Sequence, residues 1–366
     1  MNLKLFKNFD WILFVVMVLL VALGVCLVYS TTLDIRLHTS LAYKQIIFAL
    51  VGIGAIFIIS FLIPYEVLGS YVWALYGGVN ILLAMVLFWG RTVRGTTGWL
   101  RFGPIQFQPS EFAKIILIIT LAWYFSRHLE GTIQLRHIVT SGILTLVPAG
   151  LVLLEPDLGT ALLFVTLWFG MLIISGARKL HILLTFSLGV LISVSSWFFL
   201  LKPYQKARLA TFINPHLDPL GRGYNILQSM IAVGSGGFWG KGLGQGTQSQ
   251  LQFLPAQHTD FIFAVMAEEL GFIGVSFLLS LFLVLFLRLV RIAKLSKDNF
   301  GILLVLGVGV LIFIEVIINI GMNIGILPVT GIPLPLVSYG GSSLVATLLG
   351  LGLVESVAVR RKQTLF

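Results

Sequence analysis

The chain has 366 residues, of which 58% are hydrophobic and 10% are charged, and its formal net charge is +10. A soluble domain carries roughly 25% charged residues, so this composition excludes a water-soluble globular protein and indicates a membrane protein. The single cysteine, Cys26, excludes a disulfide framework and a metal site built from cysteines.

Apolar runs long enough to cross a bilayer recur along the whole chain. We predict an all-α polytopic membrane protein with about ten transmembrane helices and no separate soluble domain. The first run lacks a small-x-small cleavage site, so we interpret it as a retained helix rather than a signal peptide. The predicted spans are 11–30, 44–63, 70–90, 112–126, 138–154, 160–176, 181–201, 261–287, 301–325 and 341–359.

The distribution of lysine and arginine predicts the orientation. An even number of spans places both termini on one side. Basic residues are more numerous in the short connections on that side once the long connection 202–260 is set aside, so the positive-inside rule predicts cytoplasmic termini. Basic clusters in 91–114 and 202–241 then lie on the outer face, where they fit either anionic ligands or lipid headgroups.

The connection before the fourth predicted span ends in FQPSEFAK, residues 107–114. A proline, a serine and Glu111 form a helix start. Glu111 and Lys114 lie three residues apart and can pair on one helix face. They form either a plain ion pair or part of a site near the membrane boundary. Arg101, with its planar set of donors, suits a pyrophosphate group.

The connection LEPDLGT, residues 154–160, joins the fifth and sixth predicted spans. It carries two carboxylates, Glu155 and Asp157, which can hold a cation or orient an arginine. Equally, Asp157 can cap the helix that follows. The spacing does not decide between these interpretations.

The long connection 202–260 contains a predicted helix and a glycine-rich run. Apolar residues recur at helical spacing from Tyr224 to Val233, which predicts a short helix in the membrane interface. The run from Gly234 to Gly246 holds one lysine, Lys241. Its backbone either cradles a phosphate or only turns tightly. It does not match the Walker pattern, because Gly242 follows the lysine.

This connection ends in QHTDFIF, residues 257–263, directly before a long apolar helix. Asp260 would lie at the start of that helix, at the mouth of the membrane. It is either a helix cap or a functional carboxylate that acts as a general base or binds a divalent cation.

Charged residues and broken backbone also occur inside the last predicted spans. Glu268, Glu269 and Glu315 lie within apolar runs, where an ionisable group needs a partner. The uncharged segment 327–343 is rich in proline and glycine, which marks irregular backbone that is buried in protein or lines a cavity.

Several blocks of the sequence carry a family resemblance. They occur in the family's order and cover the chain from the third span to the tenth. The sequence resembles the SEDS family (shape, elongation, division and sporulation proteins), and the segments GYN, SGG and TQSQLQFLP make it more similar to RodA, the elongation member, than to FtsW, the division member. The blocks are FQPSEFAK, PDLGT, NPHLDPLGRGYNILQS, GSGGFWGKGLGQGTQSQLQFLPAQHTDFIFAVMAEELGF and LPVTGIPLPLVSYGGSS.

The resemblance implies a fold, a location and an activity. It implies a single SEDS-type transmembrane domain over 1–366 in the bacterial cytoplasmic (inner) membrane. Both termini would be cytoplasmic, with a long extracytoplasmic loop between helices seven and eight. The activity would be that of a peptidoglycan glycosyltransferase that polymerises lipid II during cell elongation and releases undecaprenyl pyrophosphate. Extracytoplasmic loops at about 91–111 and 202–260 would form the active-site face.

The resemblance also implies partners and leaves alternatives. The expected partners are lipid II, membrane lipid, a class B penicillin-binding protein with transpeptidase activity, and other proteins of the elongation complex, but no nucleic acid. The alternatives are a lipid II flippase, whose case rests on the intramembrane glutamates and the broken backbone, a division-specific polymerase, and a scaffold without activity of its own.

The resemblance assigns roles to individual residues. The family's essential acid falls on Asp260, as a general base or a cation ligand, and its acid–base pair falls on Glu111 and Lys114. No tightly bound cofactor is expected, but a divalent cation, Mg²⁺ or Mn²⁺, at Asp260 stays open. The residues expected to bind the pyrophosphate or sugar are Arg101, Arg208, Lys241, His258 and Ser338. The polar residues with an expected structural role are Asp157, Glu268 and Glu269.

Overall fold

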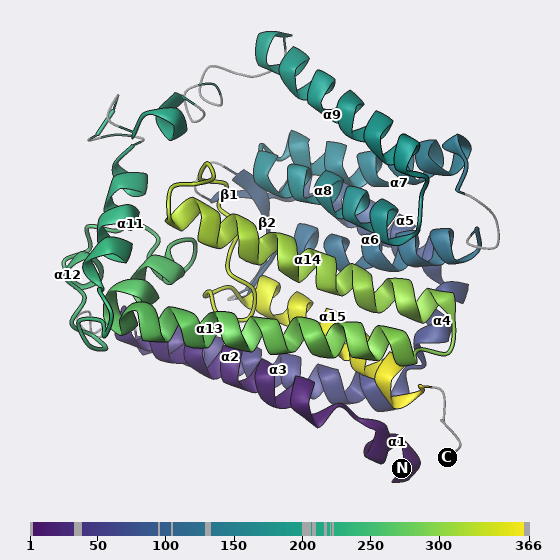
Figure 1. The fold of residues 1–366 in the computed structure, drawn as a ribbon, viewed down its shortest axis with the longest axis horizontal. Helices are drawn as coiled ribbons and strands as arrows, with labels where there is room; N and C mark the ends of the chain where they lie inside the picture. The colour runs from purple at the N-terminus through teal and green to yellow at the C-terminus, as the bar shows by residue number, and fades with distance from the viewer. Residues whose placement is uncertain are drawn as a thin grey trace.

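The computed structural model describes residues 3–32, 39–93, 96–103, 105–128, 133–199, 206, 210–215, 218–219, 221 and 223–361. Within these residues, ten helices of 17 or more residues form one bundle (Figure 1). Each of them coincides with a predicted span, which confirms a mostly helical membrane protein. The helices are α2 (Trp11–Ser30), α3 (Thr39–Leu62), α5 (Val72–Trp89), α6 (Pro109–Ser126), α7 (Leu135–Leu154), α8 (Leu158–Ile174), α9 (Lys179–Phe199), α13 (Ile262–Leu295), α14 (Asn299–Asn323) and α15 (Gly341–Val359).

Eight of these helices are long and apolar enough to cross a membrane, and α8 is a shorter apolar helix. The remaining helix, α6, carries Glu111 and Lys114 in its first two turns. These charges lower its mean hydropathy, and they also explain why the predicted span began at residue 112 rather than at Pro109.

Four short helices lie at the two ends of the bundle. They are α1 (Leu3–Asn8), α4 (Tyr65–Ser70), α11 (Tyr224–Ser235) and α12 (Thr247–Gln250). The predicted short helix at 224–233 is confirmed by α11. Figure 1 shows α1 and the last turn of α15 at one end of the bundle, and α11 and α12 at the opposite end. The two termini therefore share one side, as predicted.

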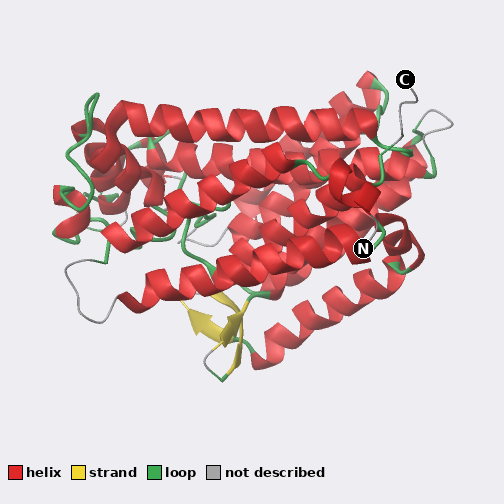
Figure 2. Cartoon of the chain, turned by 90° about the horizontal axis from the view of Figure 1, so that it is seen from below, coloured by secondary structure: helices red, strands yellow, loops and turns green. Residues whose placement is uncertain are grey.

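The connection between α5 and α6, predicted only as a loop, forms a small sheet at the edge of the all-α bundle. Residues there form three antiparallel strands in the order β1-β2-β3, namely β1 (Arg91–Val93), β2 (Thr96–Phe102) and β3 (Ile105–Phe107). Threonine, tryptophan and phenylalanine in β2 favour a strand, and Gly103, at φ +61°, provides the turn that follows. Figure 2 shows the strands at the edge of the helical bundle.

The centre of the bundle is formed by α14 and α15, whereas α9 lies at its margin. In the most apolar window of α15, 83% of the residues are buried inside the protein. No residue of α9 is buried. The helices α6 and α13, which also carry polar residues of interest, pack against α14 and α15 at this centre.

Helix α13 is broken near its outer end, which corrects the continuous span predicted at 261–287. Gly271 has φ +62° and ψ −160°, a conformation accessible almost only to glycine. The chain on either side is helical, up to Leu295. The backbone N–H groups of Phe272 and Ile273 donate to the carbonyls of Gly237 and Phe238, so the glycine-rich run replaces hydrogen bonds that a continuous helix would make itself.

Candidate active site

The segment that leads into α13 is held by residues far away in the sequence. The Ser338 hydroxyl donates to the carbonyl of Thr259 at 2.6 Å. The backbone N–H of Tyr339 donates to the carbonyl of His258 at 2.8 Å. The rings of His258 and Tyr339 meet edge to face, with centroids 5.7 Å apart. Two of the predicted site residues, His258 and Ser338, are thus neighbours in space.

The next carbonyl, that of Asp260, is held by two amides of α14. Asn319 Nδ2 donates to it at 3.1 Å and Asn323 Nδ2 at 3.0 Å. A Cβ atom built on Gly331 would lie 3.7 Å from Asp260 Oδ2, so the carboxylate faces the irregular segment before α15. Three consecutive carbonyls, 258 to 260, therefore each accept a hydrogen bond from the α14–α15 region.

The predicted pair Glu111–Lys114 is formed, and it has a third member. Lys114 Nζ lies 2.8 Å from Glu111 Oε2 and 2.7 Å from Glu315 Oε1. All three side chains are buried, and Lys114 is only 3% exposed. Glu315 thus finds the partner that an intramembrane carboxylate requires.

Helix α14 connects this ion cluster to Asp260. Glu315 and Asn319 are four residues apart, so they lie on one face of the helix about 6 Å apart along its axis. One binds Lys114 and the other binds the carbonyl of Asp260. The connection between α5 and α6 is also bonded to the start of α15, because the N–H of Gln108 donates to Ser342 Oγ at 3.1 Å.

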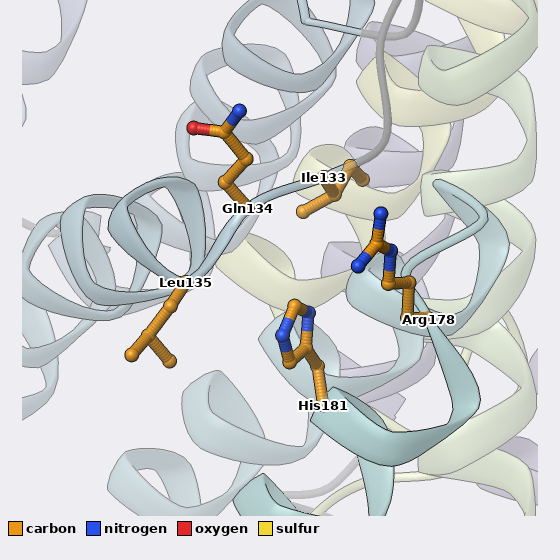
Figure 3. Close-up of a pocket in the computed structure, with 5 residues that line it drawn as sticks. All are labelled: Ile133, Gln134, Leu135, Arg178 and His181. Carbon is orange, nitrogen blue, oxygen red and sulfur yellow. The ribbon is translucent and has the colours of Figure 1, made fainter.

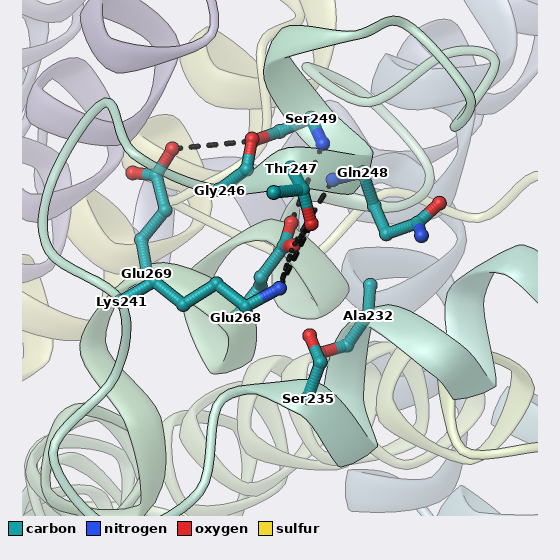
Figure 4. Close-up of polar contacts among 9 residues, drawn as sticks. All are labelled: Ala232, Ser235, Lys241, Gly246, Thr247, Gln248, Ser249, Glu268 and Glu269. Atoms are coloured by element: carbon teal, nitrogen blue, oxygen red, sulfur yellow. Dashed lines mark hydrogen bonds and ion pairs between the residues drawn. The ribbon is translucent and has the colours of Figure 1, made fainter.

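Lys241 belongs to a second cluster, drawn in Figure 4. Its Nζ lies 2.8 Å from Glu268 Oε1 and donates to Thr247 Oγ1 at 2.9 Å. Glu268 also accepts the backbone N–H groups of Gln248 at 3.0 Å and Ser249 at 3.3 Å. The carboxylate therefore caps the short helix α12 from outside, and Lys241 is already ion-paired.

The glycine-rich run around Lys241 uses its backbone donors inside the protein. The N–H groups of Lys241 and Gly242 donate to the carbonyls of Glu268 and Glu269 at 3.0 and 2.9 Å. The N–H of Gly244 donates to Ser30 Oγ at 2.9 Å, and Ser30 in turn donates to Glu269. The backbone N–H groups of Lys241, Gly242 and Gly244 therefore already have partners inside the protein. Glu268 and Glu269 hold the glycine-rich run in place through these contacts.

The carboxylates of the 155–157 connection differ from each other. Asp157 caps α8, accepting the N–H of Thr160 at 3.0 Å and its hydroxyl at 2.8 Å. Glu155 is 1% exposed, and its Oε1 has no hydrogen-bond partner in the part of the chain that the structure describes. Burial, and then the charge of Asp157, raises the pKa of Glu155 to about 8.

Of the two predicted arginines, the structure describes only Arg101. Arg101 is exposed on β2, and its Nε donates to the carbonyl of Gly103 at 2.9 Å, so most of its guanidinium is available at the surface. Arg208 lies outside the described residues. The sequence analysis missed Asn319 and Asn323, although two amides one turn apart in an apolar helix are a signal for an interhelical contact.

Within the described residues, no group of three or more histidine, cysteine, aspartate or glutamate side chains could hold a metal ion. A cation at Asp260 would therefore need ligands from a bound molecule. This requirement agrees with Mg²⁺ chemistry, which commonly uses one or two carboxylates together with substrate phosphates.

Two cavities lie away from these residues. One, of about 300 Å³, lies between the start of α7 and the α8–α9 connection, lined by Ile133, Gln134, Leu135, Arg178 and His181 (Figure 3). The other is an apolar groove of about 560 Å³ between α2 and α3, lined by Ala22, Val25, Cys26, Tyr29, Ala42, Tyr43 and Ile46. No predicted catalytic or substrate-binding residue lines either cavity.

Comparison with known proteins places this architecture in a family. Residues 10–363 match the model of the FtsW, RodA and SpoVE family, described as cell cycle proteins. The chain is 43% identical over 300 residues to the peptidoglycan glycosyltransferase MrdB of Escherichia coli K12, a match covering 82% of this chain and 81% of that protein.

Solved structures agree with this match. A chain from the structure described as "Structural coordination of polymerization and crosslinking by a peptidoglycan synthase complex" superposes with a TM-score of 0.82 at 38% identity, covering 97% of this chain and 99% of the other. The rod shape determining protein RodA of Thermus thermophilus superposes with a TM-score of 0.71 at 34% identity, covering 97% and 98%.

Proposed function

Because the chain belongs to the SEDS family of FtsW, RodA and SpoVE, we propose that it is a peptidoglycan glycosyltransferase of the bacterial inner membrane, most like RodA, that polymerises lipid II. The reaction joins a hydroxyl of an acceptor sugar to the anomeric carbon of a donor and releases undecaprenyl pyrophosphate. The observation that carries this proposal is the fixed start of α13, where Asp260 is tied to the helix that also binds Lys114.

Asp260 serves as the general base. The acceptor hydroxyl must lose its proton as its oxygen attacks the anomeric carbon, and a carboxylate within hydrogen-bond reach can take that proton. The position at the mouth of the membrane suits substrates whose sugars lie in water and whose isoprenoid tails lie in lipid. His258, two residues before Asp260 and edge to face with Tyr339, is proposed to contact the same sugars.

The leaving pyrophosphate needs positive charge beside it, because fixed charge there lowers the barrier. Lys241 and Lys114 are ion-paired with carboxylates, so they offer less charge than the sequence suggested. Arg101 is exposed and can present two parallel donors to a phosphate. Arg101, and with it Arg208, are therefore the preferred pyrophosphate ligands, and Lys114 organises the acid–base cluster.

If a divalent cation, Mg²⁺ or Mn²⁺, binds here, Asp260 would hold it in place of acting as the base, and the cation would supply positive charge that stabilises the leaving group. The apolar groove between α2 and α3 offers a place for an isoprenoid tail, since Gln257 Nε2 donates to the carbonyl of Thr31 at 3.3 Å and ties the end of α2 to the segment of Asp260.

The enzyme works with a class B penicillin-binding protein, which crosslinks the strands that this chain makes, in a complex that elongates the cell wall. The support is the similarity to a chain of a peptidoglycan synthase complex, described as coordinating polymerisation with crosslinking. The likeness to MrdB and RodA favours elongation over division.

Transport of lipid II is the alternative activity, and the arrangement of charge speaks against it. In the described part of the bundle, the ion pairs lie toward the two ends, Lys114 with Glu315 and Arg288 with Asp10. Between them, from Leu304 to Leu311, α14 consists only of leucine, valine and glycine. A polar headgroup would find no charged path along this helix.

The test is polymerisation of purified lipid II in detergent, with the partner protein and divalent cation present. Wild type is expected to form glycan strands and Asp260→Asn none. Asp298→Asn is the matched control, because Asp298 caps α14 at the end where the termini lie. Full polymerisation by Asp260→Asn would exclude the proposed base. No product from folded wild type would exclude the enzyme and favour a transporter or a scaffold.

A further inference from the structure

We infer that Asn319 and Asn323 of α14 are positioning residues for Asp260, and that their amide groups set the place of its carboxylate. The inference rests on the proposed role of Asp260 as the base and adds the residues that hold it. Neither asparagine was singled out by the sequence. Both are completely buried, at 0% exposure.

The two amides converge on one backbone oxygen. Asn319 Nδ2 and Asn323 Nδ2 lie 3.1 and 3.0 Å from the carbonyl oxygen of Asp260. A carbonyl has two lone pairs, so both bonds can form at once. Because the carbonyl and the Cβ of Asp260 are attached to the same Cα atom, fixing the carbonyl restricts where the carboxylate can point.

Asn323 also closes the first turn of α13. Its Oδ1 accepts the N–H of Ala264 at 3.2 Å while its Nδ2 binds the carbonyl of Asp260. The N–H of Ala264 is one of the first-turn donors that have no partner within the helix, since the first such bond joins the N–H of Val265 to the carbonyl of Phe261 at 3.2 Å. The helix has no side-chain cap from its own N-cap residue, Phe261. One amide from another helix therefore defines where α13 begins.

The asparagines are themselves fixed. Asn319 Nδ2 donates a second hydrogen bond, of 2.8 Å, to the carbonyl of Ile332. Asn323 Nδ2 donates to the carbonyl of Asn319 at 2.8 Å, and Ser229 of α11 donates to the carbonyl of Asn323 at 2.8 Å. Asp260 is thus set relative to α11, α14 and the segment before α15 at once.

This arrangement serves catalysis better than it serves stability. A buried amide in an apolar helix is costly unless it is fully hydrogen-bonded, and a leucine of similar size avoids that cost. A catalytic base, in contrast, has to stand within hydrogen-bond reach of one proton, and an error of about 1 Å can lower the rate by about 100-fold. Two amides on one carbonyl supply that accuracy.

The test compares Asn319→Leu and Asn323→Leu with wild type in the lipid II assay, with kcat and KM measured separately and the melting temperature of each variant determined. Both variants are expected to lose about 10- to 100-fold in kcat with less than about threefold change in KM. The control is Asn80→Leu in α5, where Nδ2 donates to the carbonyl of Tyr76 at 2.7 Å, far from Asp260 in the chain. It is expected to keep the wild-type kcat.

Asn323→Asp separates positioning from helix capping. A carboxylate keeps the acceptor for the N–H of Ala264, but it loses the donor to the carbonyl of Asp260. We expect kcat to stay at least about 10-fold low even at a temperature where the variant is folded. Wild-type kcat from this variant, or kcat within threefold of wild type from both leucine variants, would overturn the inference. An inactive wild type would instead refute the proposed function, so the two failures can be told apart.

Discussion

Two clusters in this chain pair glutamate with lysine, one around Glu268 and Lys241 and the other around Lys114, Glu111 and Glu315. They differ in which groups bind the charged side chains. Glu268 accepts two backbone N–H groups as well as Lys241, whose side chain is 29% exposed. Lys114 is paired only with the side chains of Glu111 and Glu315, and all three are buried.

We interpret the Glu268–Lys241 cluster as a structural framework and the Lys114 cluster as part of the candidate reaction centre. A carboxylate bound by backbone N–H groups fixes a loop through those hydrogen bonds. A cluster made only of side chains can exchange protons or partners while the backbone stays in place.

The largest effect is expected from removing Lys114, and removal of Lys241 from the other cluster provides the contrast. Lys114→Met leaves two carboxylates buried together, and should cost about 3 to 5 kcal/mol and abolish polymerisation, because an uncompensated buried charge is the expensive case. Lys241→Met should cost about 1 kcal/mol or less, since this lysine is partly exposed and Glu268 keeps its backbone donors. Thermal melts and lipid II polymerisation measure both. Equal losses of stability and of polymerisation in the two variants would contradict the proposed difference between the two clusters.

Glu155 extends the comparison to a buried carboxyl whose Oε1 has no donor in the described structure. Its pKa of about 8 lies above the unfolded value of 4.5. The folded state then holds a proton that the unfolded state has lost, so stability falls as the pH rises from about 4.5 to 8. Glu155→Gln removes this loss and should stabilise the protein at pH 8 by on the order of 3 kcal/mol, with little effect near pH 4.5. Melting curves of the two proteins that stay parallel across this range would contradict the prediction.

Substitution of Gly271 tests the framework cluster, because the glycine-rich run that contains Lys241 bonds to the backbone on both sides of this glycine. A Cβ there would lie 2.3 Å from the backbone nitrogen of Gly240, and the conformation is strained for alanine. Gly271→Ala should destabilise the protein by about 2 to 3 kcal/mol and loosen the glycine-rich run. Gly54→Ala in α3 is the control, because nothing lies within 4 Å of its added Cβ. Equal melting temperatures for the two variants would show that the backbone at Gly271 accepts a side chain without a cost in stability.

Arg101 should give the smallest effect on stability. Its side chain is exposed, so Arg101→Lys should change the free energy of unfolding by less than about 0.5 kcal/mol. Since lysine lacks the planar pair of donors, KM for lipid II should rise a few-fold. Steady-state kinetics check this, and an unchanged KM would remove Arg101 from the substrate site.

Apolar runs predicted the spanning helices well, because burial in lipid requires a long apolar segment wherever a helix crosses. They failed where polar residues are helical, as at the start of α6, and where the helix is broken without loss of apolar character. Gly271 lies in such a run, and its replacement hydrogen bonds come from residues more than 30 positions earlier.

The sequence pointed to the charged residues of the candidate site and to His258 and Ser338, but not to the two asparagines that bind the carbonyl of Asp260. Asp260, Glu111 and Lys114 are charges at a membrane boundary, which is a strong signal. Asn319 and Asn323 are neutral and lie among isoleucine and glycine, so hydropathy barely registers them. Lys241 was assigned to phosphate because glycines surround it, whereas the partners of that loop lie on a distant helix that a local pattern cannot show.

The break at Gly271 also has a mechanical consequence. The 24 residues from Phe272 to Leu295 make a rod of about 36 Å, longer than a hydrocarbon layer of about 30 Å, and its last turns carry Arg288, Arg291 and Lys294. In an unbroken helix, the direction of this rod would also fix the direction of the first turn. At Gly271 the run 237–242 makes the connection instead, accepting the N–H groups of Phe272 and Ile273 on one side of the break and donating to the carbonyls of Glu268 and Glu269 on the other.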